Sequence, residues 1–137
     1  MKMYILVRDD VPLGFAMVAV AHASLAGYLA YKDHPEVIEW LSGPFRKAVC
    51  KVGAEEFENS KAVPDHIVLT ESALGGREVA IAFRPRAEWP RMFKALHLYK
   101  VPQFEGDSLR AGAEPCPSAF SIPSSPTSTH HGCCRSA

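Results

Sequence analysis

The chain has no excess of charge of either sign, because its 137 residues carry 15 lysines and arginines against 15 aspartates and glutamates. Net charge therefore gives no general attraction to nucleic acid or to a membrane, and only a local cluster could supply one. Cysteine is scarce in the patterned part of the sequence, where only Cys50 lies; the others are Cys116, Cys133 and Cys134. This placement argues against a disulfide framework and favours a reducing compartment, which we take to be the cytoplasm.

Long hydrophobic runs are missing at the N-terminus, where MKMYILVRDD holds a five-residue apolar run closed by charges. That run is too short for a signal-peptide core. A longer uncharged stretch follows, eighteen residues from Val11 to Tyr28. Its length matches a membrane span, but much of it is alanine and glycine, and His22 and Ser24 lie near its centre, where polar groups are costly. We therefore expect a helix packed on a sheet, and no membrane partner.

The composition changes near Lys100. Residues 1–100 carry the hydrophobic pattern of one domain, and residues 101–137 are rich in proline, serine, glycine and alanine. Because the second segment lacks periodic apolar residues, we predict a disordered tail.

Strand and helix patterns alternate within residues 1–100. Apolar, β-rich segments predict four strands at MYILVR, FRKAVCKV, HIVLT and EVAIAF, with a short closing strand at LHLYK. Helices are predicted at 14–32, 34–41, 54–61 and 85–94, the last with a break at Pro90. Gly75 and Gly76 predict a hairpin turn, since glycine tolerates positive φ. The expected fold is α/β: three layers, with a four-stranded mixed sheet between helices.

Phe15, Ala19 and His22 stand at i, i+4 and i+7, and so share one face of the first predicted helix. That face opens at the strand-to-helix turn, where α/β folds usually place ligands. Arg8-Asp9-Asp10 ends the strand at the same point, and a carboxylate near a histidine can orient it and raise its basicity. We expect a buried His22 in a site of acid–base character. Ser24 points about 200° away around the helix, which disfavours a serine hydrolase.

These residues resemble the type 2 peptidyl-tRNA hydrolase family. That family begins with an apolar strand ending Arg-x-Asp, then a turn containing Gly-Lys, then a helix that includes His-Ala. Here Arg8-Asp9-Asp10, Gly14 and Ala21-His22-Ala23 match those features. The stretch 66–100, HIVLTESALGGREVAIAFRPRAEWPRMFKALHLYK, also resembles the C-terminal half of one subgroup. The resemblance covers residues 1–100 and not the tail.

The resemblance implies the fold of that family and hydrolysis of the ester that joins a peptide to the 3′ end of tRNA. Water attack on an ester needs a base and a group that stabilises the oxyanion. The implied catalytic residues are His22, Asp10 and Glu71, and the implied substrate-binding residues are Arg8, Gly14, Phe15 and Thr70. The family implies tRNA or peptidyl-tRNA as partner and pairing as homodimers. No cofactor or metal is expected.

The chain departs from the family at important positions. Phe15 stands where the family has its catalytic lysine, and no lysine lies between Lys2 and Lys32. Ala19 replaces a glutamine, and Glu71 corresponds to an aspartate. Losing one electrostatic donor typically costs on the order of 10²–10³ in rate. Two alternatives follow: an inactive RNA- or protein-binding module on the same fold, or a hydrolase acting on a different small substrate.

Basic residues cluster in two segments, FRKAVCK and RPRAEWPRMFK. In the second segment Trp89 and Phe93 lie among the arginines, which is compatible with an RNA-binding face. The alternative is an ordinary solvated helix whose aromatic side chains belong to the core. The sequence leaves both open.

Overall fold

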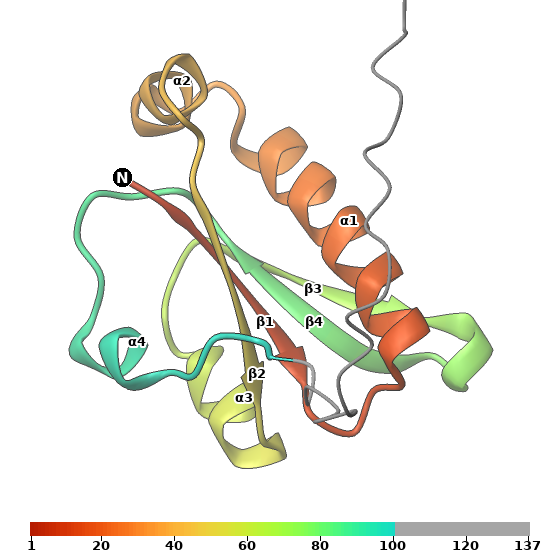
Figure 1. Ribbon diagram of the computed structural model, residues 1–137. Coiled ribbons are helices and arrows are strands. Elements are labelled where there is room, and N and C mark those ends of the chain that lie inside the picture. Colours follow the sequence, from red (N-terminus) through yellow and green to blue (C-terminus); the bar gives the residue numbers. More distant parts are fainter. Residues whose placement is uncertain (101–137) are drawn as a thin grey trace, which may run out of the picture. The chain divides into compact units, whose positions relative to one another are not determined.

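The structure, a computed structural model, describes residues 1–100, and the tail predicted for 101–137 lies outside them. One mixed sheet contains β1 (Met3–Arg8), β2 (Lys47–Val52), β3 (His66–Glu71) and β4 (Arg77–Phe83), in the order β2-β1-β4-β3 (Figure 1). β1 runs parallel to β2, while β4 is antiparallel to both β1 and β3. The predicted α/β class and four-stranded mixed sheet are confirmed.

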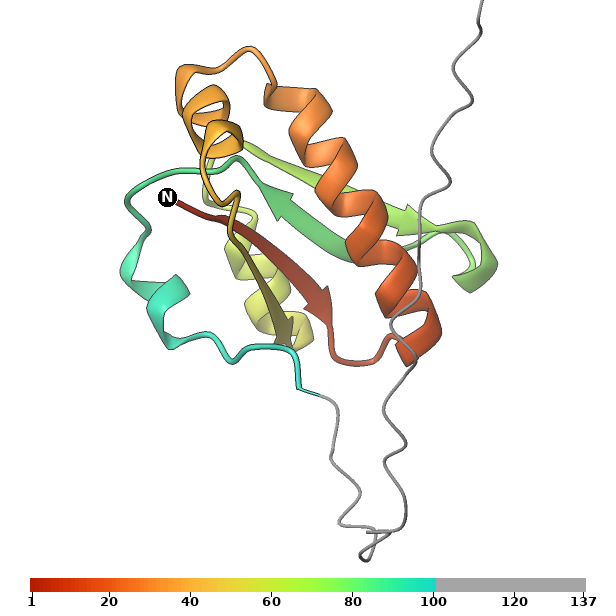
Figure 2. The same ribbon diagram turned by 45° about the horizontal axis from the view of Figure 1, so that its top comes forward.

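Helices cover both faces of the sheet, because the central strands are apolar on both sides. Met3, Ile5 and Val7 of β1 join the core formed with α1 (Leu13–Tyr31) and α2 (Pro35–Ser42). The alternate residues Tyr4 and Leu6 join a second core on the opposite face. That core includes Phe57 of α3 (Ala54–Ser60) and Phe93 of α4 (Arg91–Ala95). Figure 2 shows α1 lying alongside β4 and β3.

Helix α1 turns its smallest side chains toward the sheet. Its buried residues are Ala16, Ala19, Ala23 and Gly27. Its large apolar side chains point outward and are exposed: Leu13, Met17, Val18, Leu25 and Leu29. By length and composition alone, α1 is the one helix of residues 1–100 that could cross a membrane. In the structure its alanine and glycine stripe packs on the sheet.

The predicted helix over 85–94 is wrong in extent, since α4 begins only at Arg91. Proline disfavours the helical conformation in the residue before it, so Pro90 holds Trp89 outside the helix and becomes the N-cap. The indole of Trp89 donates instead to the carbonyl of Arg86 at 3.1 Å.

The predicted glycine turn is confirmed, whereas the predicted closing strand is reduced to an isolated bridge. Gly75 and Gly76 have φ of 73° and 72°, the left-handed region that favours glycine. They follow a single 3-10 turn, η1 (Ser72–Leu74), in the β3–β4 connection. The predicted closing strand is a short antiparallel bridge between Leu98 and Cys50. It places residues 97–99 along the outer edge of β2.

Candidate active site

The end of β1 carries an ion-pair cluster centred on Asp10. Arg8 is the last residue of β1, and its Nε and NH2 donate to the two carboxylate oxygens of Asp10 at 3.1 and 3.0 Å. Arg77, the first residue of β4, approaches from the other side, with NH1 3.4 Å from Asp10 Oδ2. A second Arg77 nitrogen donates to the Asp10 backbone carbonyl at 3.4 Å. One carboxylate therefore holds two guanidinium groups at one end of the two central strands.

The hydrogen bonds from Arg8 hold the pKa of Asp10 below its usual range, and the charge of Arg77 lowers it further. Asp10 thus stays ionised at neutral pH. A carboxylate with a lowered pKa is a poor proton acceptor, so Asp10 is better suited to orient the two arginines than to serve as a base.

Glu71 lies near this cluster because it is paired with Arg77 between neighbouring strands. It is the last residue of β3 and lies directly opposite Arg77 in the β3–β4 register. Its Oε1 accepts a hydrogen bond from the backbone N–H of Ala73 at 3.0 Å, which fixes the carboxylate at the start of η1. Arg77 therefore has the Asp10 carboxylate at its guanidinium and Glu71 as its sheet partner. Thr70, beside Glu71, is exposed and follows a register shift after Leu69.

Arg8 is held rather than freely solvated, because its side chain is only 20% exposed. Its guanidinium carbon lies 5.7 Å from the centre of the Phe57 ring, in cation–π geometry. Arg77 is the more open of the two, with 39% of its side chain exposed. Of the two cations, Arg77 is therefore better placed to meet a ligand.

The first turn of α1 supplies Gly14 and Phe15. Gly14 is exposed, and a Cβ added to it would meet no other atom within 4 Å. Phe15 is half-buried and packs against the core that α1 forms with the sheet. The Phe15 side chain is therefore partly used for packing.

His22 is exposed, so the expectation of a buried histidine is wrong. It lies seven residues after Phe15, about 10 Å further along the helix. Within residues 1–100 it makes no hydrogen bond or ion pair, and the structure does not couple it to Asp10 or Glu71. The error has a physical cause: Ala19 and Ala23 form the buried stripe, and His22 stands just outside it.

Arg77 is the residue that sequence reasoning missed as part of a site. The signal was present, because a hairpin closed by Gly75 and Gly76 sets a cross-strand neighbour for Glu71. Within residues 1–100, no group of three or more histidines, cysteines, aspartates or glutamates is arranged to hold a metal ion.

Neither a comparison with protein-family models nor a search of curated proteins finds a match to this chain. The function must therefore be argued from the residues and their arrangement.

Proposed function

We propose that residues 1–100 have the fold of the type 2 peptidyl-tRNA hydrolases and that the protein hydrolyses the ester between a peptide and the 3′ end of tRNA. The sequence motifs at Arg8-Asp9-Asp10 and Ala21-His22-Ala23 support this proposal. The observation that carries it is the cluster at one end of the sheet, where the guanidinium of Arg77 contacts the Asp10 carboxylate and Glu71 is the backbone partner of Arg77 on the neighbouring strand.

In the proposed reaction Glu71 is the base. One oxygen accepts from Ala73, which leaves the other free to take a proton from water. The water oxygen then attacks the ester carbonyl carbon, and the carbonyl oxygen becomes an oxyanion. When this intermediate collapses, the bond to the ribose 3′ oxygen breaks, and that oxygen takes the proton from Glu71. The products are a free peptide acid and tRNA.

Arg77 takes the electrostatic role that the family gives to its lysine. A guanidinium carries a permanent charge and several N–H donors in a fixed plane, which suits an oxyanion. Asp10 keeps this group in place through the contact at 3.4 Å. Phe15 supplies an apolar side chain at the first turn of α1, and a Cβ at Gly14 would meet no other atom within 4 Å.

The test is release of peptide from labelled peptidyl-tRNA by the full chain. Glu71→Gln and Arg77→Gln should each lower kcat by on the order of 10²–10³. The matched controls are Glu88→Gln and Arg91→Gln, two exposed residues outside the cluster that remove the same charges. If the first pair changes turnover no more than the second, the assignment of base and oxyanion partner is wrong.

An inactive RNA-binding module is the second candidate, and the packing of Phe15 favours it. Phe15 packs partly against the core, and no lysine stands at this position to stabilise an oxyanion. A wild-type chain without turnover that gains it in the Phe15→Lys variant would establish this second candidate.

A further inference from the structure

The structure separates the two basic segments. In RPRAEWPRMFK the first two arginines are paired with acids, Arg84 with Glu36 and Asp65, and Arg86 with Asp65. Arg91 and Lys94 are exposed and form no ion pair within residues 1–100. Phe93 is buried in the second core, and Trp89 packs against it with ring centroids 4.7 Å apart. Two of its four cations are neutralised and both of its rings pack in the second core, so this segment offers no exposed ring beside an unpaired cation.

The other segment, FRKAVCK, has its cations free. Lys47 and Lys51 lie on the same face of β2, and both are exposed. Neither takes part in any ion pair within residues 1–100. Just before the strand, Phe45 leaves 51% of its surface exposed. Its ring lies 4.6 Å from the Lys47 Nζ, so an exposed ring and an unpaired cation stand side by side.

The segment along the outer edge of β2 places a second ring beside a lysine, and this ring is half-buried against the core beneath α1. The backbone N–H of Tyr99 donates to the carbonyl of Val49 at 2.8 Å, and that of Lys51 donates to His97 at 3.2 Å. These bonds place the Tyr99 ring 5.7 Å from the Lys51 Nζ. Lys100 follows and is exposed. Phe45, Lys47, Lys51, Tyr99 and Lys100 together form what we call the β2-edge track.

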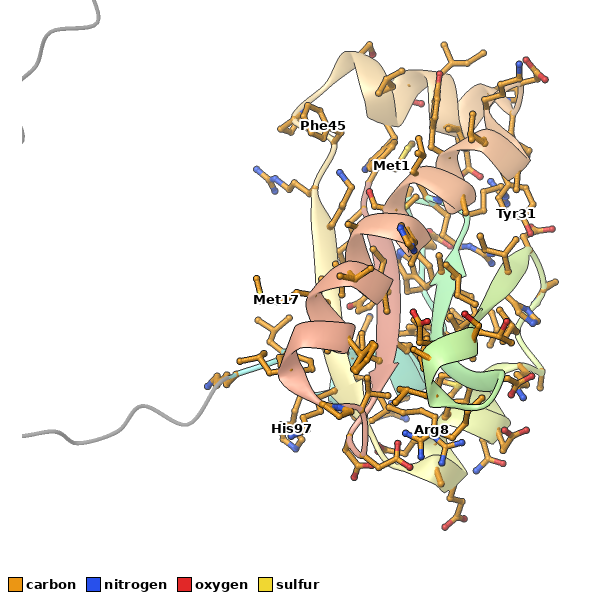
Figure 3. All side chains as sticks on the ribbon, turned by 90° about the vertical axis from the view of Figure 1, so that its right-hand side faces the viewer. Met1, Arg8, Met17, Tyr31, Phe45 and His97 are labelled. Carbon is orange, nitrogen blue, oxygen red and sulfur yellow. The ribbon has the colours of Figure 1, made fainter. Side chains whose placement is uncertain are left out.

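The β2-edge track leads to the candidate active site. β1 and β2 are parallel, so their carboxyl ends meet: Arg8 is opposite Val52, and Asp9 donates to the Val52 carbonyl at 2.9 Å. A hollow of about 600 Å3 opens here, with Lys51 and Lys100 in its lining and the carboxylates of Asp9 and Glu56 also present. Figure 3 shows Phe45 and His97 on the same side of the molecule, near opposite ends of β2.

We propose that the β2-edge track binds single-stranded RNA and, if the proposed function holds, the unpaired 3′ end of the tRNA. Unpaired lysines contact phosphates and release counterions. Exposed rings stack on bases without regard to sequence. An extended strand flanked by alternating rings and cations fits a single strand, whose bases are free to stack, better than a duplex. The 3′ end then reaches the Arg8–Asp10 cluster at the carboxyl end of β2.

The experiment measures binding of the full chain to two labelled probes, deacylated tRNA and a single-stranded RNA that copies its 3′ end, over a series of salt concentrations. The track variant is Lys47→Gln/Lys51→Gln/Lys100→Gln. The matched control is Lys32→Gln/Arg91→Gln/Lys94→Gln, which removes three exposed positive charges elsewhere. Phe45→Leu removes an exposed ring while keeping an apolar side chain against Trp40.

The slope of log affinity against log salt is negative, and the track variant should make it less steep by about 2. Each of the three lost phosphate contacts on a single strand accounts for about 0.7 of that change. Phe45→Leu should weaken binding of the single-stranded probe roughly 5- to 100-fold. The control should leave both quantities close to wild type.

Three outcomes would overturn the proposal: equal effects of the track and control variants, no binding of wild type to either probe at low salt, or binding to vesicles of anionic lipid in place of RNA. The last outcome would assign the lysines and the exposed apolar side of α1 to a membrane surface. Because the probes carry no ester, the result is independent of catalysis. Loss of binding in the track variant without any hydrolysis by wild type would uphold the track and remove the proposed function.

Discussion

Two glycines of α1 allow the packing of the helix on the sheet to be measured with one chemical change. A Cβ added to Gly27 would lie 3.2 Å from the Cβ of Ala82 and 3.3 Å from the Met3 Cε, whereas a Cβ at Gly14 would meet nothing within 4 Å. Met3 ends in a flexible group that can move. Ala82 cannot move away in the same manner, because it is fully buried in β4, a strand that is paired on both sides.

Replacing either glycine by alanine raises helix propensity by up to about 1 kcal/mol. At Gly27 overpacking costs about 1–3 kcal/mol, so Gly27→Ala should lower the free energy of unfolding by about 0–2 kcal/mol. Gly14→Ala has no such cost and should raise it by about 0.5–1 kcal/mol, less than the full value because Gly14 lies in the first turn. For a domain of this size, 1 kcal/mol corresponds to about 4–8 °C in Tm.

Thermal unfolding followed by circular dichroism should therefore place the Tm of Gly27→Ala below that of Gly14→Ala by roughly 2–24 °C. Urea unfolding gives the same comparison as free energies. Equal gains in the two variants would show that α1 does not approach β4 this closely, and the account of its inward small-residue stripe would fail.

Two further predictions concern titration and reactivity. Hydrogen bonds from Arg8 and Arg84 lower the pKa values of Asp10 and Glu36 in the folded state, so their stabilisation is complete above about pH 4.5 and is lost as the pH falls through the folded pKa values. Urea unfolding of Asp10→Asn/Glu36→Gln across acidic pH should show a flatter stability profile, with a difference of about 0.2–1 kcal/mol per exposed pair; a profile as steep as wild type would contradict it. Burial raises the pKa of the Cys50 thiol, so iodoacetamide at neutral pH should label Cys50 only after unfolding, as located by peptide mass spectrometry. Labelling of Cys50 in the folded protein at the rate of a free thiol would show that this strand is open.

The strands were predictable because their signals are local. MYILVR is apolar without interruption and matches β1 residue for residue, as expected for a strand covered on both faces. Gly75 and Gly76 likewise marked a turn that only glycine adopts readily. The orientation of α1 was not predictable in this way. Apolar residues surround the whole helix, so periodicity cannot say which side faces the sheet, and His22 was assigned to the wrong one.

The candidate site was only partly predictable for a related reason. Arg8 and Asp10 are two residues apart, and their pairing follows from the strand end that carries them. Arg77 comes from 67 residues beyond Asp10, and its contact depends on the order of strands in the sheet. The free lysines of β2 could be recognised only once the acids that neutralise Arg84 and Arg86 were located.

The short bridge between Leu98 and Cys50 has a consequence for how the protein behaves in a crowded solution. An outer strand presents unpaired N–H and C=O groups that another chain can extend into a larger sheet. Residues 97–99 occupy part of this row on β2, through the bonds of Tyr99 to Val49 and of Lys51 to His97. The two lysines of β2 add like-charge repulsion between copies. Backbone pairing with residues 97–99 and repulsion between lysines therefore both disfavour pairing of β2 with a strand of a second protein. The lysines that would bind an RNA strand are the same ones that supply this repulsion.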